Sequence, residues 1–353
     1  MHTDTLIIGG GLAGLSLASR LTDLGHSYIL AEARDRLGGR IAAVRHEGAT
    51  YDMGPAWFWP GQPRIAKLIG DLGLRRFDQY AQGDLMFEDA QGQPQRGQGF
   101  SSMQGSYRLE GGLIRLIERL SEGVPASNLH LSSAITALTE QGDIITAKLQ
   151  DGRTITAGRA VLALPPRLAA QITYAPTLPG TSMQAMHQTA TWMAGHAKAV
   201  AIYDRPFWRE AGLSGDAMSL FGPMAEVHDA SPAQGGPYAL FGFLGVPPQA
   251  RANEHALRQH ILSQLTRLFG AQAASPVSLS IKDWAFDPFT ANAQDQQPLY
   301  AHPDYGLPAP LSGLWDGKLI LGGTEVAPEF GGYLEGALEA AENALRLLTR
   351  PER

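Results

Sequence analysis

The sequence predicts an α/β fold that begins with a dinucleotide-binding βαβ unit. Three observations support this prediction: an apolar run at residues 5–8, the spacing of Gly9, Gly11 and Gly14, and a second apolar run that ends in the acid Glu32. The segment between the glycines and the second run has helical periodicity. A strand, a glycine turn, a helix and a second strand in this order form the unit that holds a dinucleotide's phosphates.

Each glycine of the turn has a distinct role. Gly9 permits the tight turn, Gly11 lets the backbone approach a pyrophosphate, and Gly14 lets the helix pack closely against the strand. The phosphates lie at the positive end of the helix, where Leu12 and Ala13 begin it. These five residues are therefore predicted to bind the cofactor.

An acid and a short arginine-rich run follow the second strand. Glu32 comes 18 residues after Gly14, where a carboxylate accepts the ribose hydroxyls and repels a 2′-phosphate. The guanidinium groups of the following run offer paired donors to a phosphate or a carboxylate. The predicted cofactor-binding residues of this run are Ala33, Arg34, Gly38, Gly39 and Arg40.

Composition limits the class of protein. A chain of 353 residues is long enough for about two domains. The net charge of −6 gives no reason to expect nucleic acid or an anionic membrane as a partner. We find no apolar run that could span a membrane and no signal peptide, so we expect a soluble, cytoplasmic protein. The chain has no cysteine, and its histidines lack metal-ligand spacing, so no metal site is predicted.

From Glu32 onward the chain resembles the flavin amine oxidases, which include monoamine oxidases, polyamine oxidases and L-amino acid oxidases. The ExxxRxGGR pattern carries the first likeness, and further blocks resemble the family in the same order. These blocks are YDMGPAWFWPGQPRI (51–65), YRLEGGLIRLIERL (107–120), AITALTE (134–140), AVLALPP (160–166), HAKAVAIYDRPFW (196–208), KDWAF (282–286) and GGTEVAPEFGGYLEGAL (322–338). The resemblance covers essentially the whole chain.

The resemblance implies a Rossmann-like FAD-binding domain of the glutathione reductase type and a second, mixed-sheet substrate domain. We assign residues 1–78, 106–187 and 287–353 to the first domain. Residues 79–105 and 188–286 form the second. Larger relatives carry a helical subdomain where this chain has room only for a hairpin near residues 84–95, so we expect a site that is less enclosed or that a partner subunit closes.

The resemblance also implies FAD as the cofactor. Monoamine oxidases link FAD to a cysteine after the tryptophan motif, and Ala293 occupies that place here. We therefore expect FAD to bind without a covalent bond. The family's motifs carry the cofactor contacts onto Met53, Gly54, Pro55, Ala56, Ile135, Trp284, Gly323, Thr324, Glu325, Gly332, Tyr333 and Leu334. Glu325 would accept a ribityl hydroxyl, which we favour over the alternatives of a helix-capping or salt-bridging acid.

Lys198 and Tyr333 are the predicted catalytic residues. In the family the matching lysine holds a water near flavin N5 and assists the reaction with oxygen, although a lysine at a strand start would ordinarily point to solvent. The matching tyrosine lines the substrate side of the flavin and is often paired with a second tyrosine. Our alignment places Gln294 at that second position. Trp57 is a further predicted substrate-lining residue, although the cluster Trp57-Phe58-Trp59 could equally belong to the hydrophobic core.

The expected activity is that of an FAD-dependent amine oxidase. A neutral primary or secondary amine would pass hydride from Cα to flavin N5, and oxygen would then give hydrogen peroxide. The alternatives are a dehydrogenase or desaturase acting on a non-amine substrate, and a non-catalytic flavin-binding partner protein. An amino acid substrate would require an arginine facing the flavin; the candidates are Arg96, Arg108, Arg205 and Arg209. The sequence leaves the amine class, the native electron acceptor and the oligomeric state open.

Overall fold

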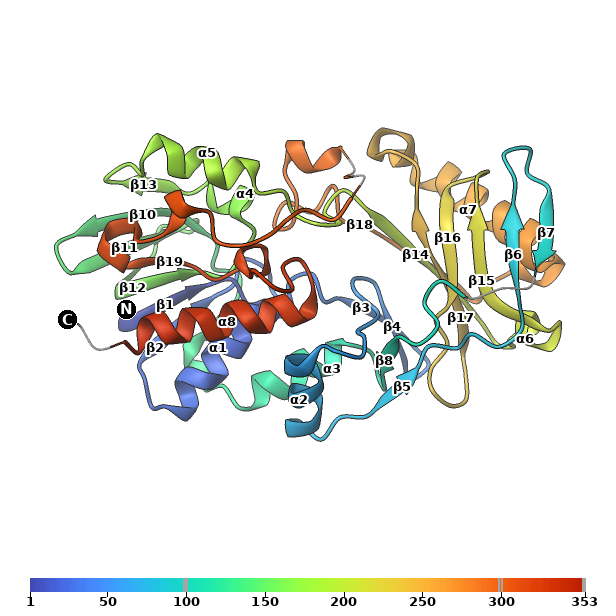
Figure 1. Cartoon of the computed structure of the whole chain (residues 1–353), viewed down its shortest axis with the longest axis horizontal. Helices are drawn as coiled ribbons and strands as arrows, with labels where there is room; N and C mark the ends of the chain where they lie inside the picture. Colours follow the sequence, from blue (N-terminus) through green and yellow to red (C-terminus); the bar gives the residue numbers. More distant parts are fainter. Residues whose placement is uncertain (98–100, 298, 300, 351–353) are drawn as a thin grey trace.

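Two β-sheets lie toward opposite ends of the long axis of the molecule (Figure 1). The computed structural model describes residues 1–97, 101–297, 299 and 301–350. The first sheet has the strand order β13-β10-β11-β12-β1-β2-β9, and β19 pairs with β12 beside it. Its strands are β1 His2–Ile8, β2 Tyr28–Ala31, β9 Leu129–His130, β10 Ile135–Gln141, β11 Ile144–Leu149, β12 Thr154–Leu162, β13 Thr173–Ala175 and β19 Leu319–Leu321.

The first sheet contains the predicted βαβ unit. Strand β1 runs parallel to both β2 and β12, and helix α1 (Leu12–Asp23) connects β1 to β2. Side chains alternate along β1, so Ile7 enters the core beneath α1 while Leu6 and Ile8 enter the core on the opposite face. The parallel strands of the sheet are thus covered on both faces, as parallel strands require, while β11 pairs antiparallel with β10 and β12.

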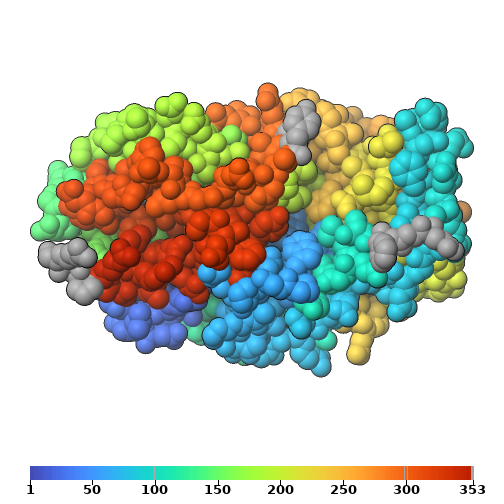
Figure 2. All heavy atoms as spheres, viewed as in Figure 1, coloured from blue at the N-terminus to red at the C-terminus, as the bar shows by residue number. Residues whose placement is uncertain are grey.

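Helices cover the two faces of this sheet (Figure 1). On one face α1 packs with α3 (Ile114–Glu122) and α8 (Leu334–Leu348). On the other face lie α4 (Pro166–Ala169) and α5 (Gly180–Gln188). In the space-filling view the C-terminal segment lies directly against the N-terminal segment, so the two ends of the chain pack together on this sheet (Figure 2).

The second sheet has the order β18-β14-β17-β16-β15-β6-β7 and is antiparallel except between β6 and β15. Helix α7 (Glu254–Phe269) packs on the face away from the first sheet. The strands are β6 Asp84–Glu88, β7 Pro94–Gly97, β14 Ala197–Tyr203, β15 Leu213–Ser219, β16 Met224–Asp229, β17 Tyr238–Leu244 and β18 Ser278–Asp283. The hairpin expected near residues 84–95 is present as β6 and β7.

Further short elements lie outside the two large sheets. They are the pairs β3 Ala43–His46 with β4 Ala49–Asp52 and β5 Arg76–Asp78 with β8 Tyr107–Leu109, the helices α2 Pro63–Asp71 and α6 Phe207–Glu210, and the 3₁₀ turns η1 Ala126–Asn128, η2 Pro248–Arg251, η3 Ala271–Ala274, η4 Ala293–Gln296, η5 Ala309–Leu311, η6 Leu314–Gly317 and η7 Thr324–Val326. The domain division predicted from the sequence assigns every strand of the second sheet to the substrate domain. That division itself stays a prediction.

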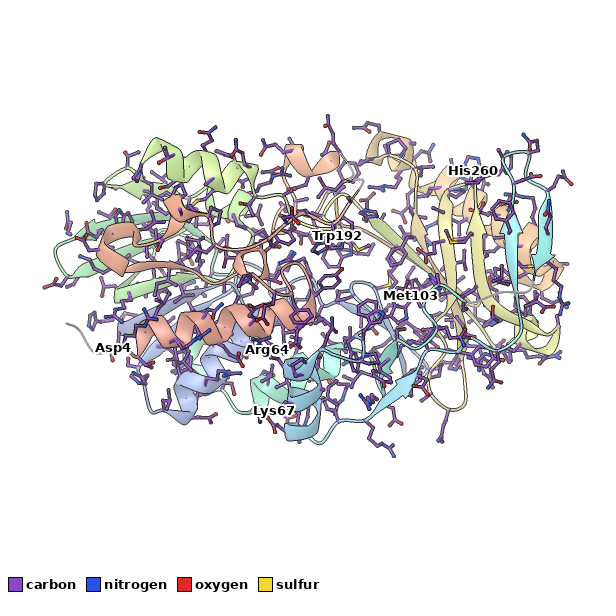
Figure 3. All side chains as sticks on the ribbon, in the orientation of Figure 1. Asp4, Arg64, Lys67, Met103, Trp192 and His260 are labelled. Atoms are coloured by element: carbon purple, nitrogen blue, oxygen red, sulfur yellow. The ribbon has the colours of Figure 1, made fainter. Side chains whose placement is uncertain are left out.

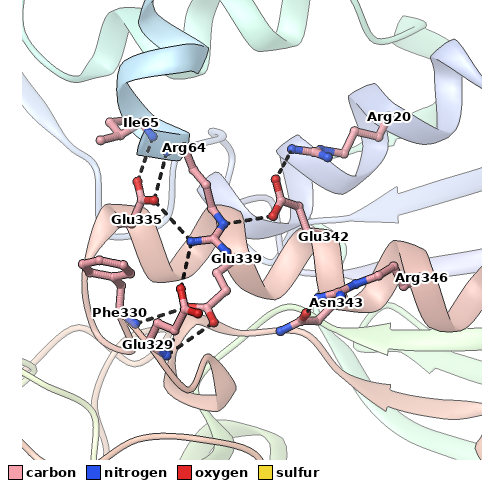
Figure 4. A network of polar contacts seen from close by, with 10 residues as sticks. All are labelled: Arg20, Arg64, Ile65, Glu329, Phe330, Glu335, Glu339, Glu342, Asn343 and Arg346. Atoms are coloured by element: carbon pink, nitrogen blue, oxygen red, sulfur yellow. Dashed lines mark hydrogen bonds and ion pairs between the residues drawn. The ribbon is translucent and has the colours of Figure 1, made fainter. Parts of the chain in front are cut away.

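A polar network fixes α8 to the N-terminal helices (Figure 4). The buried carboxylate of Glu335 accepts hydrogen bonds from the backbone N–H groups of Arg64 (2.9 Å) and Ile65 (2.8 Å) at the start of α2. Glu342 accepts from Arg20 of α1 (3.0 Å) and from Arg64 (2.9 Å). The carboxylate of Glu335 satisfies donors that a helix start leaves unpaired, so the network stabilises the junction of three helices.

Within the part of the chain that the structure describes, no helix combines the length and apolar character needed to cross a membrane.

Candidate functional site

One cleft of about 920 Å³ is lined by residues of both sheets and of the segments between them. Trp192 and Met103, which Figure 3 labels near the middle of the long axis, both line it. At one end the cleft reaches the start of α1, and at the other it reaches the face of β14, β17 and β16. A ligand filling it would therefore contact both sheets.

The glycines at the first end bring the backbone unusually close together. A Cβ atom at Gly14 would lie 2.0 Å from the carbonyl oxygen of Gly9, and one at Gly9 would lie 2.5 Å from that of Ala163. Gly9 also has a φ of +112°, which favours glycine. Gly11 is the N-cap of α1 and makes no side-chain cap. The start of this helix is thus free to receive an anion.

Glu32 is held firmly beside that helix start. Its side chain accepts hydrogen bonds from the backbone N–H groups of Gly10 (2.6 Å) and Arg34 (2.9 Å), and it lines the cleft. The Arg34 guanidinium donates to Asp287 (2.6 Å) and Thr290 (2.8 Å). Arg34 therefore fastens the 287–290 segment to the cleft wall.

Glu325 is completely buried behind the cleft wall. One carboxylate oxygen accepts from Arg40 (2.6 Å), while Oε2 is buried with no hydrogen-bond partner among the described residues. Burial by itself lowers the pKa of Arg40, but the charge and hydrogen bond of Glu325 outweigh it and raise the pKa. A Cβ at Gly323, which lines the cleft, would lie 3.2 Å from the free oxygen. A ligand hydroxyl reaching past Gly323 would satisfy it.

These features fit a flavin dinucleotide. The start of α1 has no side-chain cap, the Glu32 carboxylate is fixed at the end of β2, and Oε2 of Glu325 lies buried beside Gly323 without a hydrogen-bond donor. Most of the residues predicted to bind cofactor or substrate line this single cleft. They are Gly9, Gly11, Leu12, Ala13, Glu32, Ala33, Arg34, Gly38, Gly39, Arg40, Met53, Gly54, Pro55, Ala56, Trp57, Ile135, Lys198, Trp284, Gly323, Thr324, Gly332, Tyr333 and Leu334.

Three predicted residues lie off the cleft surface. Gly14 packs against Gly9, and Glu325 lies behind Gly323. Gln294 is exposed on η4 and does not line the cleft, so the prediction that it is substrate-lining is wrong. The reason is local: Asn292 caps η4, and Asp295 turns inward to pair with Arg167 (2.5 Å), which leaves Gln294 outside.

Tyr333 has aromatic neighbours that the sequence did not assign to it. Its ring stacks on His302 at a centroid distance of 4.8 Å and meets the edge of Trp59 at 6.2 Å. Thr324 donates a hydrogen bond to the Tyr333 carbonyl (2.9 Å), which anchors the loop before α8. Tyr333 is partly exposed, and both it and Trp59 line the cleft. The run Trp57-Phe58-Trp59 was the feature of the sequence that pointed to Trp59 as an aromatic neighbour. Nothing in the sequence marked His302.

Lys198 is buried, with only 2% of its surface exposed, and does not point to solvent. Its ammonium donates to the carbonyl of Gly54 (3.1 Å) and lies 3.9 Å from the centroid of Phe241. Burial lowers the pKa of Lys198; the nearby Arg108 lowers it further, and Asp52 opposes both. A cation next to an aromatic face and a carbonyl is partly stabilised there.

Several cleft residues on the second sheet had not been predicted. Phe243 of β17 lies opposite Lys198 of β14, and Glu226 of β16 lies opposite Phe243. His196 also lines the cleft, and burial lowers the pKa of its imidazole. Strand register brings these side chains together, and a linear motif does not reveal it.

The sequence is similar to those of flavin-containing enzymes over nearly its whole length. The family profile described as "Flavin containing amine oxidoreductase" matches residues 12–96 and 85–347. The chain is 24% identical to a "Probable flavin-containing monoamine oxidase A" of Dictyostelium discoideum, over 96% of this chain and 95% of the relative. It is 25% identical to an "L-amino acid dehydrogenase" of Synechocystis, over 98% and 94% of the two chains.

Solved structures are similar to this chain over nearly its whole length. A variant of putrescine oxidase has a TM-score of 0.82 at 20% identity and covers 99% of each chain. Cyclohexylamine oxidase from Brevibacterium oxydans has a TM-score of 0.80 at 18% identity and covers 98% of each. These similarities confirm the predicted fold class, a Rossmann-like nucleotide-binding fold with a second, mixed sheet.

Proposed function

This chain belongs to the flavin containing amine oxidoreductase family, and from that premise we propose that it oxidises a small primary or secondary amine and uses molecular oxygen as electron acceptor. Its cofactor is FAD, and it is an FAD-dependent oxidoreductase. With no cysteine in the chain, a cysteinyl bond to the flavin cannot form. FAD is held by hydrogen bonds, the start of α1 and burial.

The residues that would hold FAD divide into three groups along the cleft. Backbone N–H groups from Gly11 to Ala13 would receive the pyrophosphate, and Glu32 would accept the ribose hydroxyls. The 53–56 segment and the loop before α8 would flank the flavin ring. Bound FAD supplies a two-electron acceptor that takes hydride from the amine Cα and is reoxidised by oxygen.

The buried ammonium of Lys198 is the main observation that supports oxygen as the electron acceptor. It is a buried lysine whose ammonium is held by the carbonyl of Gly54 and the face of Phe241, on the wall of the cleft. When oxygen accepts electrons, negative charge develops, and a fixed cation in a dry site stabilises it without reorganisation. The net reaction converts an amine, oxygen and water into an aldehyde, ammonia or a smaller amine, and hydrogen peroxide.

Aromatic walls favour the neutral form of the amine. Tyr333, Trp59 and Trp57 line the cleft, and Phe243 forms part of its floor. These side chains exclude water, so a charged ammonium at the reacting end would lose hydration without compensation. A neutral amine retains the nitrogen lone pair, which assists departure of hydride from the adjacent carbon.

An amino acid is a poorer substrate candidate, even though one relative is called an L-amino acid dehydrogenase. The arginines that could have held a carboxylate point elsewhere. Arg96, Arg205 and Arg209 pair with Asp84, Glu210 and Asp229, and Arg108 donates to the carbonyls of Ala230 and Ser231. Among the described residues, the arginines that line the cleft are Arg34 and Arg40, and both pair with carboxylates.

The test is anaerobic mixing of the flavin-loaded protein with monoamines, polyamines and amino acids, followed by air. Bleaching of the flavin by an amine class, then recovery with release of hydrogen peroxide, is the expected result. Bleaching without recovery in air would replace the oxidase with a dehydrogenase. Protein that dithionite reduces but no amine bleaches would overturn the proposal in favour of a non-amine substrate or a structural flavin.

A further inference from the structure

A short segment after β18 lies over the nucleotide end of the cleft. It comprises residues 287–290, which we call the strap. Pro288, Phe289 and Thr290 line the cleft. Phe286, directly before the strap, is 54% exposed and does not line the cleft. The strap therefore lies between this end of the cleft and the solvent.

The strap is a tight turn that the Asp287 side chain stabilises. The backbone N–H groups of Thr290 (3.0 Å) and Ala291 (2.9 Å) donate to the Asp287 carbonyl, and that of Phe289 donates to Oδ1 of Asp287 (3.1 Å). Pro288 follows Asp287, and its fixed φ favours the second position of such a turn. Asp287 and Thr290 are buried, whereas Pro288 and Phe289 are exposed. The turn thus holds together as a unit and directs its two polar side chains inward.

Cations from two distant parts of the chain fasten the strap. Arg34, from the segment after β2, donates to Oδ1 of Asp287 (2.6 Å) and to the Thr290 hydroxyl (2.8 Å). Lys282 of β18 donates to Oδ2 of Asp287 (2.6 Å), so both oxygens of the carboxylate are occupied. Nη1 of Arg34 also lies 3.6 Å from Oε1 of Glu32. The fastening is therefore beside the acid that would accept the ribose hydroxyls.

These ion pairs stay charged at neutral pH. Burial raises the pKa of Asp287, but the hydrogen bonds and charges of Lys282 and Arg34 outweigh burial and lower the pKa. The side chains of Asp287 and Arg34 are only 9% and 11% exposed, so salt screens their interaction less than that of a surface pair. Charge-assisted hydrogen bonds are also about twice as strong as neutral ones. Several partly buried contacts therefore hold the strap closed.

The fastening residues act on the strap and not directly on a ligand. Asp287 and Lys282 do not line the cleft, whereas the other three residues of the strap do. A group that touches no ligand interacts almost equally with the free and the loaded protein, so it shifts the binding equilibrium little. It does determine how often the strap opens, and opening limits passage in both directions. Weaker fastening should therefore speed both uptake and release.

We propose that the strap is a gate for FAD and that Asp287, paired with Arg34 and Lys282, keeps the gate closed. Because the chain has no cysteine to bond the flavin, the time that FAD stays bound depends on its rate of release. Opening requires Asp287 to separate from Arg34, after which the strap moves away from Glu32 and frees the nucleotide end. Asp287 is thus a positioning residue for the cofactor. The inference rests on FAD as the cofactor and holds whichever amine is oxidised.

The experiment measures FAD uptake and release in the wild type, Asp287→Asn and Lys282→Met. Asparagine keeps the acceptor for the Phe289 N–H group but removes the charge, and methionine keeps the length of Lys282 beside Trp284. Uptake is followed by quenching of flavin fluorescence in stopped flow, and release by its recovery after dilution of the loaded protein. In Asp287→Asn both rates should rise about tenfold or more, while the Kd of FAD changes less than about threefold. Lys282→Met should raise both rates about threefold, since Arg34 still holds Asp287.

The control for these variants is Glu140→Gln. Glu140 of β10 is a partly buried acid paired with Lys318 (2.5 Å), and neither residue lines the cleft. This variant loses an ion pair of the same kind in the first sheet and should keep the wild-type rates of uptake and release. Rates that rise in Glu140→Gln as much as in Asp287→Asn would indicate general loosening of the protein and overturn the gate.

Two further results would overturn the proposal. Unchanged rates in Asp287→Asn and Lys282→Met mean that the strap does not control passage, and Lys282→Met decides this alone if Asp287→Asn does not fold. Faster release with unchanged uptake, and a Kd that rises in proportion, means that Asp287 contributes to binding and not to gating. Amine oxidation does not enter these measurements, so failure of the proposed function would leave the test of the gate intact.

Discussion

The two ends of the cleft are built differently. At the nucleotide end, the groups that would face the ligand are mainly backbone atoms. Glycines pack so closely there that a Cβ added to Gly14 or Gly9 would lie 2.0 or 2.5 Å from a carbonyl oxygen, and two backbone N–H groups hold the Glu32 carboxylate beside the start of α1. At the substrate end, the ligand-facing groups are side chains on one face of the second sheet, ordered by register. A change at the first end should therefore disturb the fold, whereas a change at the second should alter one step of the reaction.

The largest effect is expected at Gly14. In Gly14→Ala the added methyl would lie 2.0 Å from the Gly9 carbonyl, so β1 and α1 must separate. We expect a loss of roughly 2 kcal/mol or more in the free energy of unfolding and nearly complete loss of bound flavin. Thermal unfolding and the flavin absorbance of the purified protein measure both.

The control for this variant is Gly70→Ala. Gly70 lies in α2 and has no atom within 4 Å of an added Cβ. Alanine there should leave flavin content unchanged and stabilise the helix by up to about 1 kcal/mol. A Gly14→Ala protein as yellow and as stable as this control would contradict the close-contact account.

The next largest effect is expected at Lys198. Lys198→Met keeps the length and apolar stem but removes the ammonium, so flavin reoxidation by oxygen should slow about a hundredfold. Reduction by amine should change much less, because the positive charge is needed in the oxygen step. Stopped-flow measurement of the two half-reactions separates them; equal slowing of both would assign Lys198 a structural role.

The pH dependence of flavin reoxidation also tests the role of the Lys198 ammonium. Burial holds the pKa of Lys198 below its usual value of 10.5. As the pH rises through this lowered pKa, the cation is lost, so the wild-type reoxidation rate should fall toward that of Lys198→Met. The variant itself should show a flat profile over the same range, and a wild-type rate independent of pH up to 10.5 would contradict the assignment.

Protein stability should respond in the same pH window with the opposite sign. Between the lowered folded pKa and 10.5, the unfolded chain binds more protons at this lysine than the folded chain does. The free energy of unfolding therefore gains a contribution that rises with pH across that window. Chemical denaturation at several pH values should show this rise in the wild type and its absence in Lys198→Met.

A smaller effect is expected at Glu32. Glu32→Gln retains the size of the side chain but replaces one of the two acceptors that bind Gly10 and Arg34, and removes the charge. The Kd of FAD, measured by fluorescence quenching on adding flavin to apoprotein, should rise about tenfold. An unchanged Kd would separate Glu32 from cofactor binding.

The smallest effect is expected at Gln294. Its side chain is exposed and lies off the cleft, so Gln294→Ala should change amine oxidation less than about twofold. A large loss with one amine and not another would return this residue to the substrate site.

The nucleotide end could be predicted from the sequence because its chemistry is local. Gly9, Gly11, Gly14 and Glu32 occupy one βαβ unit, and their spacing along the chain determines their geometry. Lys198 was predicted from its resemblance to the family's block. Its burial was not predicted, because a lysine at the start of a strand ordinarily points to solvent, whereas all seven residues of β14 are buried in the structure.

The substrate end resisted prediction for physical reasons. Glu226 faces the cleft only because of a bulge one residue earlier, and a single residue of register moves a side chain to the other face. Tyr333 meets His302 and Trp59, which are distant from each other in sequence. Gln294 was misplaced because the cap formed by Asn292 and Asp295 sets the direction of η4, and a gapped alignment carries no information on that turn.

A crystal structure of the flavin-loaded protein tests most directly whether Lys198 serves the reaction with oxygen, through the position of its ammonium relative to flavin N5. We expect the flavin ring to lie between the 53–56 segment and Tyr333, with the ammonium connected to N5 by a single water. A flavin ring placed away from Lys198, or a Lys198 side chain turned from the flavin toward Asp52, would contradict the proposed role of Lys198 in the reaction with oxygen.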